Sequence, residues 1–149
     1  MERIGNERTG CSNIVLPVAA GQEIMPGTMV ALNADGYAVP ASKAENLIIA
    51  GVAQARADNR LGADGAKVVG VRRGAFVMAN DKTIKQTDLL KTAYVSDATT
   101  LTLTAEGSSP VGQILEVMDD RQDWMIGGYK NVSNKCVAGA ASDRLFCGI

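Results

Sequence analysis

The sequence contains no histidine, and this absence removes several classes of catalytic site. Ser-His-Asp triads, Cys-His nucleophile pairs and zinc sites with imidazole ligands all need that side chain. Cys11 is the remaining nucleophile candidate, and only a chance contact with Arg3 or Arg8 would favour its thiolate. The carboxylate pair Asp119-Asp120 lies in a polar stretch, where we expect no desolvation of the kind that raises a pKa. We therefore expect a protein that is not an enzyme.

Cysteine is scarce as well, since only Cys11, Cys136 and Cys147 are present, without a CxxC pair. An odd number of widely spaced cysteines predicts neither a disulfide framework nor a cysteine zinc site. We expect buried or incidental thiols, and a Cys136–Cys147 bridge formed after cell lysis is the alternative. The acidic loop at 58–65 lacks the ligand spacing of an EF-hand, and GADGAK at 62–67 lacks the pattern of a phosphate-binding loop. We expect no metal and no cofactor.

A basic excess and a long apolar run are also missing. Fifteen basic and sixteen acidic residues give a formal net charge of −1, so we expect no direct binding of nucleic acid. No apolar run approaches the roughly 18 residues of a membrane helix, and no charged segment followed by an apolar one indicates a leader. We expect synthesis in the cytoplasm and no membrane partner.

Aromatic residues make up only 4% of the chain although 46% of it is hydrophobic, so alanine and valine supply much of the apolar content. Small side chains suit thin sheets, and sixteen glycines against four prolines fit many tight turns. We predict an all-β, mainly antiparallel fold, a small β-barrel or sandwich with at most one or two short helices. The predicted organisation is an N-terminal arm (1–12), one β-rich domain (13–128) and a C-terminal extension (129–149).

The stretch from Ala20 to Val39 predicts two short strands and two turns. Pro26 and Gly27 suit a type II turn, and Asp35-Gly36 is a strong hairpin signal between alternating apolar residues. In the predicted hairpin, the side chains that share one face are Val30, Leu32, Tyr37 and Val39. The hairpin indicates a small antiparallel domain and identifies no chemistry.

Two apolar segments predict strands with special positions. Residues 13–18 predict a strand at a sheet edge or a bulge, because Pro17 lacks the donor that a central ladder needs. Residues 47–53 predict a buried strand, with a bulge or a close backbone approach at Gly51.

Further along the chain, residues 67–78 predict the longest strand, which Gly70 and Gly74 allow to bend. Residues 83–91 predict one helical turn. Residues 100–104 alternate strictly, so we expect their two leucines on the core face and their three threonines facing outward.

The candidates for contact with a partner lie mostly outside these strands. Residues 1–10 have Ile4 as their apolar anchor, so they form either a disordered terminus or a segment that orders on a partner. The apolar residues of the extension are too few to form a core and need to dock on this subunit or on a neighbour. Arg72 and Arg73 point to opposite faces of a strand, so one of them is available to a carboxylate or a partner. The candidate interface residues are Glu2, Arg3, Ile4, Arg8, Arg72, Arg73, Phe146 and Ile149.

Several segments together, by their order and spacing, resemble a family of tailed-phage head decoration proteins, also called capsid cement proteins. They are AGQEIMPGTMVAL at 20–32, AGVA at 50–53, VRRGAF at 71–76, TAYVSD at 92–97 and VGQILEVMDDRQDWMIGG at 111–128. None of them is a catalytic signature. Residues 1–10 and 129–149 fall outside the resemblance.

The resemblance implies a structural virion protein, a compact β domain that binds the outside of a bacteriophage capsid after assembly in the bacterial host cytoplasm. Its partners are then the major capsid protein and further copies of itself, as a homotrimer at local threefold positions. Its task is head stabilisation: it bridges capsid subunits against internal DNA pressure through many modest contacts repeated by symmetry. We expect removal of residues 1–10 to leave the domain folded and to weaken assembly. The resemblance transfers no interface residue.

A small-molecule or carbohydrate-binding β-barrel module is the alternative function. It depends on the stacking surfaces of Trp124, Tyr37, Tyr94 and Tyr129. For Trp124, the single tryptophan, a core plug or a lid on the barrel is the more ordinary role.

Overall fold

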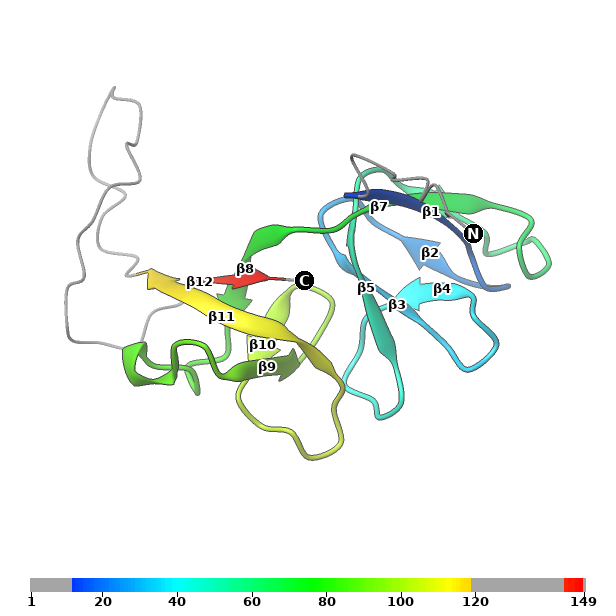
Figure 1. Ribbon diagram of the computed structural model, residues 1–149. Helices are drawn as coiled ribbons and strands as arrows, with labels where there is room; N and C mark the ends of the chain where they lie inside the picture. Colours follow the sequence, from blue (N-terminus) through cyan, green and yellow to red (C-terminus); the bar gives the residue numbers. More distant parts are fainter. Residues whose placement is uncertain (1–11, 119–143, 149) are drawn as a thin grey trace, which may run out of the picture.

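The computed structural model describes residues 12–118 and 144–148, and their regular structure is almost entirely β-strand. In chain order the strands are β1 (Asn13–Pro17), β2 (Glu23–Ile24), β3 (Met29–Leu32), β4 (Ala38–Pro40), β5 (Ile48–Ala53), β6 (Ala57–Asp58), β7 (Val68–Arg72), β8 (Ala75–Asn80), β9 (Thr92–Val95), β10 (Thr100–Thr102), β11 (Pro110–Met118) and β12 (Arg144–Gly148). Figure 1 shows two lobes, one built on a five-stranded sheet and the other on a five-stranded barrel.

The predicted fold class is confirmed. All pairs of named strands are antiparallel except β8 with β10, and the barrel is closed. One short 3₁₀ helix, η1 (Gln86–Asp88), occurs among the described residues, inside the segment where one helical turn is predicted. Nowhere in residues 12–118 or 144–148 is there a helix with the length and hydrophobicity to span a membrane.

The five-stranded sheet has the order β1-β7-β5-β3-β4 and curls until its ends approach each other. An isolated bridge joins Val18, after β1, to Ala38 in β4, and the Ala19 N–H donates to the Ala38 carbonyl at 3.0 Å. Inside the curl lies a cluster of mostly small buried side chains, Val18, Ile24, Val30, Ala38, Ala50, Ala53, Ala57, Val69 and Val71. β1 is an edge strand with Pro17 as its last residue, as predicted.

The turn between β3 and β4 is organised by Asn33. Its Oδ1 accepts the backbone N–H groups of Asp35 at 3.1 Å and Tyr37 at 2.9 Å, and Gly36 takes a φ of +82°. This side chain substitutes for backbone partners within the turn. The hairpin itself is confirmed.

The predicted face of the hairpin is wrong by one residue. Leu32 lies opposite Ala38, and Ala31 lies opposite Val39, while Tyr37 belongs to the turn. Residues directly opposite each other share a face, so Val39 lies on the other face from Leu32. The cause is the wider turn around Asn33, which shifts the returning strand.

β5 carries the predicted bulge at Gly51, whose φ is +152°. The register against β3 shifts between Val30 and Ala31. Ile49 and Val52 therefore belong to the same core cluster although they are three residues apart, where strict alternation would separate them. Because of the bulge, β5 contributes buried side chains both to the cluster inside the sheet and to the cluster that includes the barrel interior.

The prediction of one long strand at 67–78 is wrong, because the segment divides at Gly74, whose φ is +151°. β7 stays in the sheet between β1 and β5, and β8 enters the barrel between β10 and β12. The glycine expected to bend a strand is instead where the chain crosses from one lobe to the other (Figure 1).

The barrel has the strand order β10-β8-β12-β11-β9. Its interior is filled by the buried side chains of Met78, Ile84, Ala93, Val95, Leu101, Val111 and Ile114. Leu101 lies inside as predicted, but Thr102 is also buried, so the outward orientation predicted for all three threonines is wrong. The Thr102 hydroxyl accepts the Thr104 N–H at 3.2 Å and lies 3.3 Å from the Thr83 hydroxyl, which satisfies it inside the fold.

Residues 144–148, which the sequence assigns to the C-terminal extension, form β12. This strand pairs with β8 on one side and with β11 on the other, so its backbone closes the barrel of this subunit. Residues 1–11, 119–143 and 149 lie outside the described part of the chain.

The two lobes share one buried cluster. Met29 from the sheet and Leu101 from the barrel both belong to it, and the Met29 N–H donates to the Ala98 carbonyl at 2.8 Å. Ser109, which is 1% exposed, precedes β11 and accepts the Leu47 N–H, in the segment before β5, at 3.0 Å. Apolar packing and hydrogen bonds therefore both connect the lobes.

Candidate interaction surface

The loop between β6 and β7, residues 59–67, is held by Asn59, which is 1% exposed. Its Nδ2 donates to the carbonyls of Val18 at 3.1 Å, Ala19 at 3.1 Å and Ala63 at 2.9 Å. These acceptors belong to two segments, the chain after β1 and the loop itself. This buried amide adds to the backbone hydrogen bonds that join the loop to residues 18–22, such as the one from the Gly65 N–H to the Val18 carbonyl at 2.9 Å.

Leu61 lies in this loop with its side chain fully exposed, at 105%. The backbone on either side is fixed: the Gly62 N–H donates to the Asn59 carbonyl at 3.3 Å, and Asp64 Oδ1 accepts the Ala20 N–H at 2.7 Å. A Cβ at Gly62 would lie 2.1 Å from Asn59 Oδ1, so glycine is required there. The loop presents a large apolar side chain on an ordered backbone.

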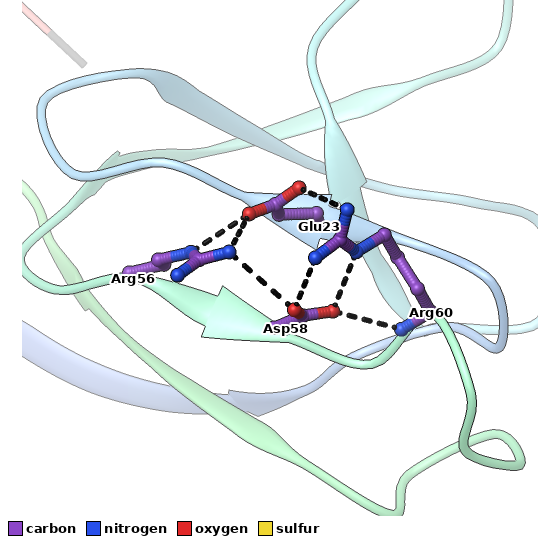
Figure 2. Close-up of polar contacts among 4 residues, drawn as sticks. All are labelled: Glu23, Arg56, Asp58 and Arg60. Atoms are coloured by element: carbon purple, nitrogen blue, oxygen red, sulfur yellow. Dashed lines mark hydrogen bonds and ion pairs between the residues drawn. The ribbon is translucent and has the colours of Figure 1, made fainter.

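Next to this loop, β2 and β6 form a two-stranded ribbon in which Glu23 lies opposite Asp58. Like charges in that position destabilise a ribbon unless countercharges join them. Figure 2 shows Arg56 and Arg60 on opposite sides of the two carboxylates, and each arginine pairs with both of them. Arg56 Nε is 2.7 Å from Glu23 Oε1, and Arg60 Nη2 is 2.7 Å from Asp58 Oδ2. The four side chains make a charge-balanced network on the surface.

Hydrogen bonds set the ionisation of this network. The side chain of Arg60, and then its backbone N–H, hold the pKa of the Asp58 carboxyl well below its ordinary value, and Asp58 in turn raises the pKa of Arg60. Because the pKa of Asp58 is lower in the folded state, its stabilising contribution is complete above the ordinary aspartate range and declines as the pH falls below it. At neutral pH both groups are charged.

Arg72 and Arg73, predicted as interface candidates, are both exposed. Arg72 ends β7 and Arg73 follows it, and neither forms an ion pair with any residue in 12–118. β7 pairs with β1, and on the outer face of these two strands Val15 is 68% exposed and Val68 is 60% exposed. The structure thus places the basic pair beside an exposed apolar area.

Of the other predicted interface residues, only Phe146 lies in the described part of the chain. Phe146 lies in β12, where the register puts it opposite Val77 of β8 and Glu116 of β11. Val77 is 47% exposed. Outside the described residues are Glu2, Arg3, Ile4, Arg8 and Ile149.

The exposed leucines were not predicted from the sequence. Besides Leu61, Leu90 is 66% exposed and Leu115 is 45% exposed. The Leu90 N–H donates to the Ile114 carbonyl at 2.8 Å, which places both leucines on one side of the barrel beside β11. A signal existed only for Leu61, the single large apolar residue in the turn-forming segment 58–65.

The residues considered for ligands do not converge. Tyr37 lies in the hairpin turn of the sheet and Tyr94 lies in β9 of the barrel, while Trp124 and Tyr129 are outside the described residues. Cys11 and Cys136 are outside them too. Within 12–118 and 144–148, no three acidic or cysteine side chains are grouped so as to hold a metal ion.

No family model, curated protein or solved structure matches this chain. The geometry itself supplies an ordered β framework that exposes large apolar side chains at separate places. Val15 and Val68 lie on the sheet, Leu61 lies in the β6–β7 loop, and Leu90 and Leu115 lie on the barrel. Such positions suit contacts with other proteins rather than the lining of one cavity.

Proposed function

We propose that this protein is a structural virion protein of the head decoration type. It binds the outer surface of a phage capsid and stabilises the shell by bridging major capsid protein subunits, as a homotrimer at threefold positions. The proposal rests first on the sequence segments between residues 20 and 128 whose order and spacing resemble those of capsid cement proteins.

One structural observation supports it most. Leu61 is fully exposed, yet its loop is fixed by the buried amide of Asn59 and by Gly62. An exposed leucine on an ordered backbone loses little conformational freedom when a partner covers it, so it suits a binding contact. Similar contacts on both lobes, repeated by the symmetry of a shell, add up to strong attachment without any single strong site.

The test is to mix the purified full chain with expanded capsids that lack decoration, and to image them by negative stain. We expect saturable binding at symmetric positions and greater resistance of the capsids to heat. Leu61→Ser is expected to weaken binding about tenfold while leaving the thermal unfolding midpoint unchanged, because the side chain makes no packing contact in the free protein. Ala63→Ser, in the same loop, is the matched control and is expected to bind like the wild type.

A chain that leaves expanded capsids bare, with unchanged heat resistance, would contradict the proposal. Binding of a small molecule or carbohydrate, the alternative from the sequence, gains no support from Tyr37 and Tyr94, which lie in different lobes. The interior of the barrel is filled by its own side chains.

A further inference from the structure

The edge of β1 that faces away from β7 has backbone groups that no other described residue binds. The Val18 N–H donates to the Lys67 carbonyl, and the Arg73 N–H donates to the Ser12 carbonyl, which fixes the alternation along the strand. Residues 12, 14, 16 and 18 therefore direct their backbone groups to β7, and residues 13, 15 and 17 direct theirs outward. The Gly70 carbonyl, opposite Val15, accordingly accepts a bond from Gln54 on the β5 side.

The outward groups of Asn13 and Val15 have no hydrogen-bond partner among residues 12–118 and 144–148. Pro17 has no N–H to offer, and beyond it the bridge from Val18 to Ala38 closes the sheet. The open edge is therefore short and well bounded. An exposed edge of this kind is a template for an added strand.

The side chains beside this edge define what can bind there. Val15 and Val68 are exposed on the outer face, and the Gln54 side chain lies over Gly70 and donates to Asn13 Oδ1 at 2.9 Å. Lys67, Arg72 and Arg73 lie at the two ends of β7, and residues 12–18 and 66–76 contain no acidic residue. Alternation along β7 puts Arg72 on the same face as Val68, while Lys67 and Arg73 stand just before and just after the strand, so the surroundings of this edge are basic in a chain whose net charge is −1.

We propose that the open edge of β1 binds an extended, acidic segment of a partner protein by strand addition. Asn13 and Val15 supply the backbone hydrogen bonds, Val15 and Val68 contact an apolar side chain of the segment, and Arg72 and Arg73 bind its carboxylates. Only the identity of the natural partner, the major capsid protein, rests on the proposed function.

The test uses the full chain labelled for NMR and a short synthetic peptide that alternates glutamate and valine. Saturating peptide is expected to slow hydrogen exchange at the amides of Asn13 and Val15, by about tenfold or more. The amides of Ile14 and Leu16 already face β7 and are expected to change little. A peptide that alternates lysine and valine is the control and is expected not to bind.

Two variants separate the charges from the backbone. Arg72→Gln with Arg73→Gln is expected to weaken peptide affinity roughly three- to tenfold, whereas Lys43→Gln with Lys82→Gln removes the same charge elsewhere and is expected to have no effect. Val15→Pro removes an N–H that makes no hydrogen bond within residues 12–118 and 144–148. It is expected to keep the fold and abolish the slowed exchange at Asn13.

Several results would overturn the inference. Unchanged exchange at Asn13 and Val15 with saturating peptide would exclude strand addition, and equal binding of the lysine peptide would exclude charge recognition. Slow exchange of both amides in the free full chain would mean that its own residues or a second copy already cover the edge. Capsid binding can succeed or fail independently of each result, so the proposed function is tested separately.

Discussion

At the scale of single residues, Asn59 and Gly62 depend on each other. The Asn59 amide donates to three carbonyls, and this orientation directs its Oδ1 towards Gly62. No residue in 12–118 donates a hydrogen bond to Oδ1, so this buried acceptor is left with the weak contact of a glycine Cα–H. The hydrogen bonds of the same amide offset the cost of this unsatisfied oxygen, because they bind the carbonyls of Val18 and Ala19, which follow β1, and the Ala63 carbonyl of the loop.

This dependence predicts a non-additive pair of substitutions. Asn59→Ala should lower the free energy of unfolding by about 1–3 kcal/mol, because the Ala19 carbonyl loses its donor and the Val18 and Ala63 carbonyls keep only their backbone donors, Gly65 and Ala66. Gly62→Ala should cost a similar amount, about 1–3 kcal/mol, since its Cβ would lie 2.1 Å from Asn59 Oδ1. In the double variant most of that second cost should disappear, and the part that remains comes from Ala66, 3.1 Å away. Urea unfolding of all four proteins measures the coupling, and simple additivity would contradict it.

At the scale of elements, two glycines with nearly the same φ have different tasks. Gly51 at +152° shifts the register of β5, and Gly74 at +151° separates β7 from β8. A Cβ at Gly51 would lie 2.3 Å from the Arg72 carbonyl oxygen, in the neighbouring strand, whereas nothing lies within 4 Å of a Cβ at Gly74. Only Gly51 is restricted both by conformation and by space.

The two alanine variants are therefore matched. Gly74→Ala is expected to lower the free energy of unfolding by about 1–3 kcal/mol through backbone strain alone. Gly51→Ala should cost more than about 4 kcal/mol or prevent folding, because the Arg72 carbonyl cannot move without disturbing the β5–β7 pairing. Thermal and urea unfolding compare them. Equal losses of unfolding free energy in the two variants would show that the close approach of Gly51 to β7 does not contribute to the cost of the substitution.

The sequence predicted which segments become strands better than it predicted where they go. Alternation and turn residues identified the β3–β4 hairpin, and Pro17 identified β1 as an edge strand. The hairpin face was missed because two amides bind the Asn33 side chain and widen the turn. Nothing local shows that Gly74 sends the chain into another lobe, since that depends on pairing with strands distant in the sequence.

The candidate surface was predicted only in part. Exposure of Arg72 and Arg73 follows from their charge, so the sequence was sufficient for them. The exposure of Leu61 depends on the loop conformation set by Asn59, and the open edge of β1 depends on which neighbours a strand finds. The exposure of Leu61 and the open edge of β1 both depend on how distant segments pair in the folded sheet, so local sequence patterns do not predict them.

At the scale of the whole molecule, the sheet and the barrel share a buried cluster, so we expect them to unfold together. Met29, fully buried in β3, belongs to the cluster that also contains Val95 and Leu101 of the barrel. The proposed role on a capsid under internal pressure fits such a shared core, because opening one lobe would expose apolar side chains of the other.

Met29→Ala tests this unity, since the truncation leaves a cavity between the lobes and should lower the free energy of unfolding by about 2–5 kcal/mol. Native-state hydrogen exchange should show the same loss at Val69 in the sheet and at Val95 in the barrel. Met25→Ala, at a half-exposed turn position, is the control and should change stability by less than about 0.5 kcal/mol. If Val69 kept its protection while Val95 lost it, the lobes would unfold separately, and the proposed contacts on the sheet would not depend on an intact barrel.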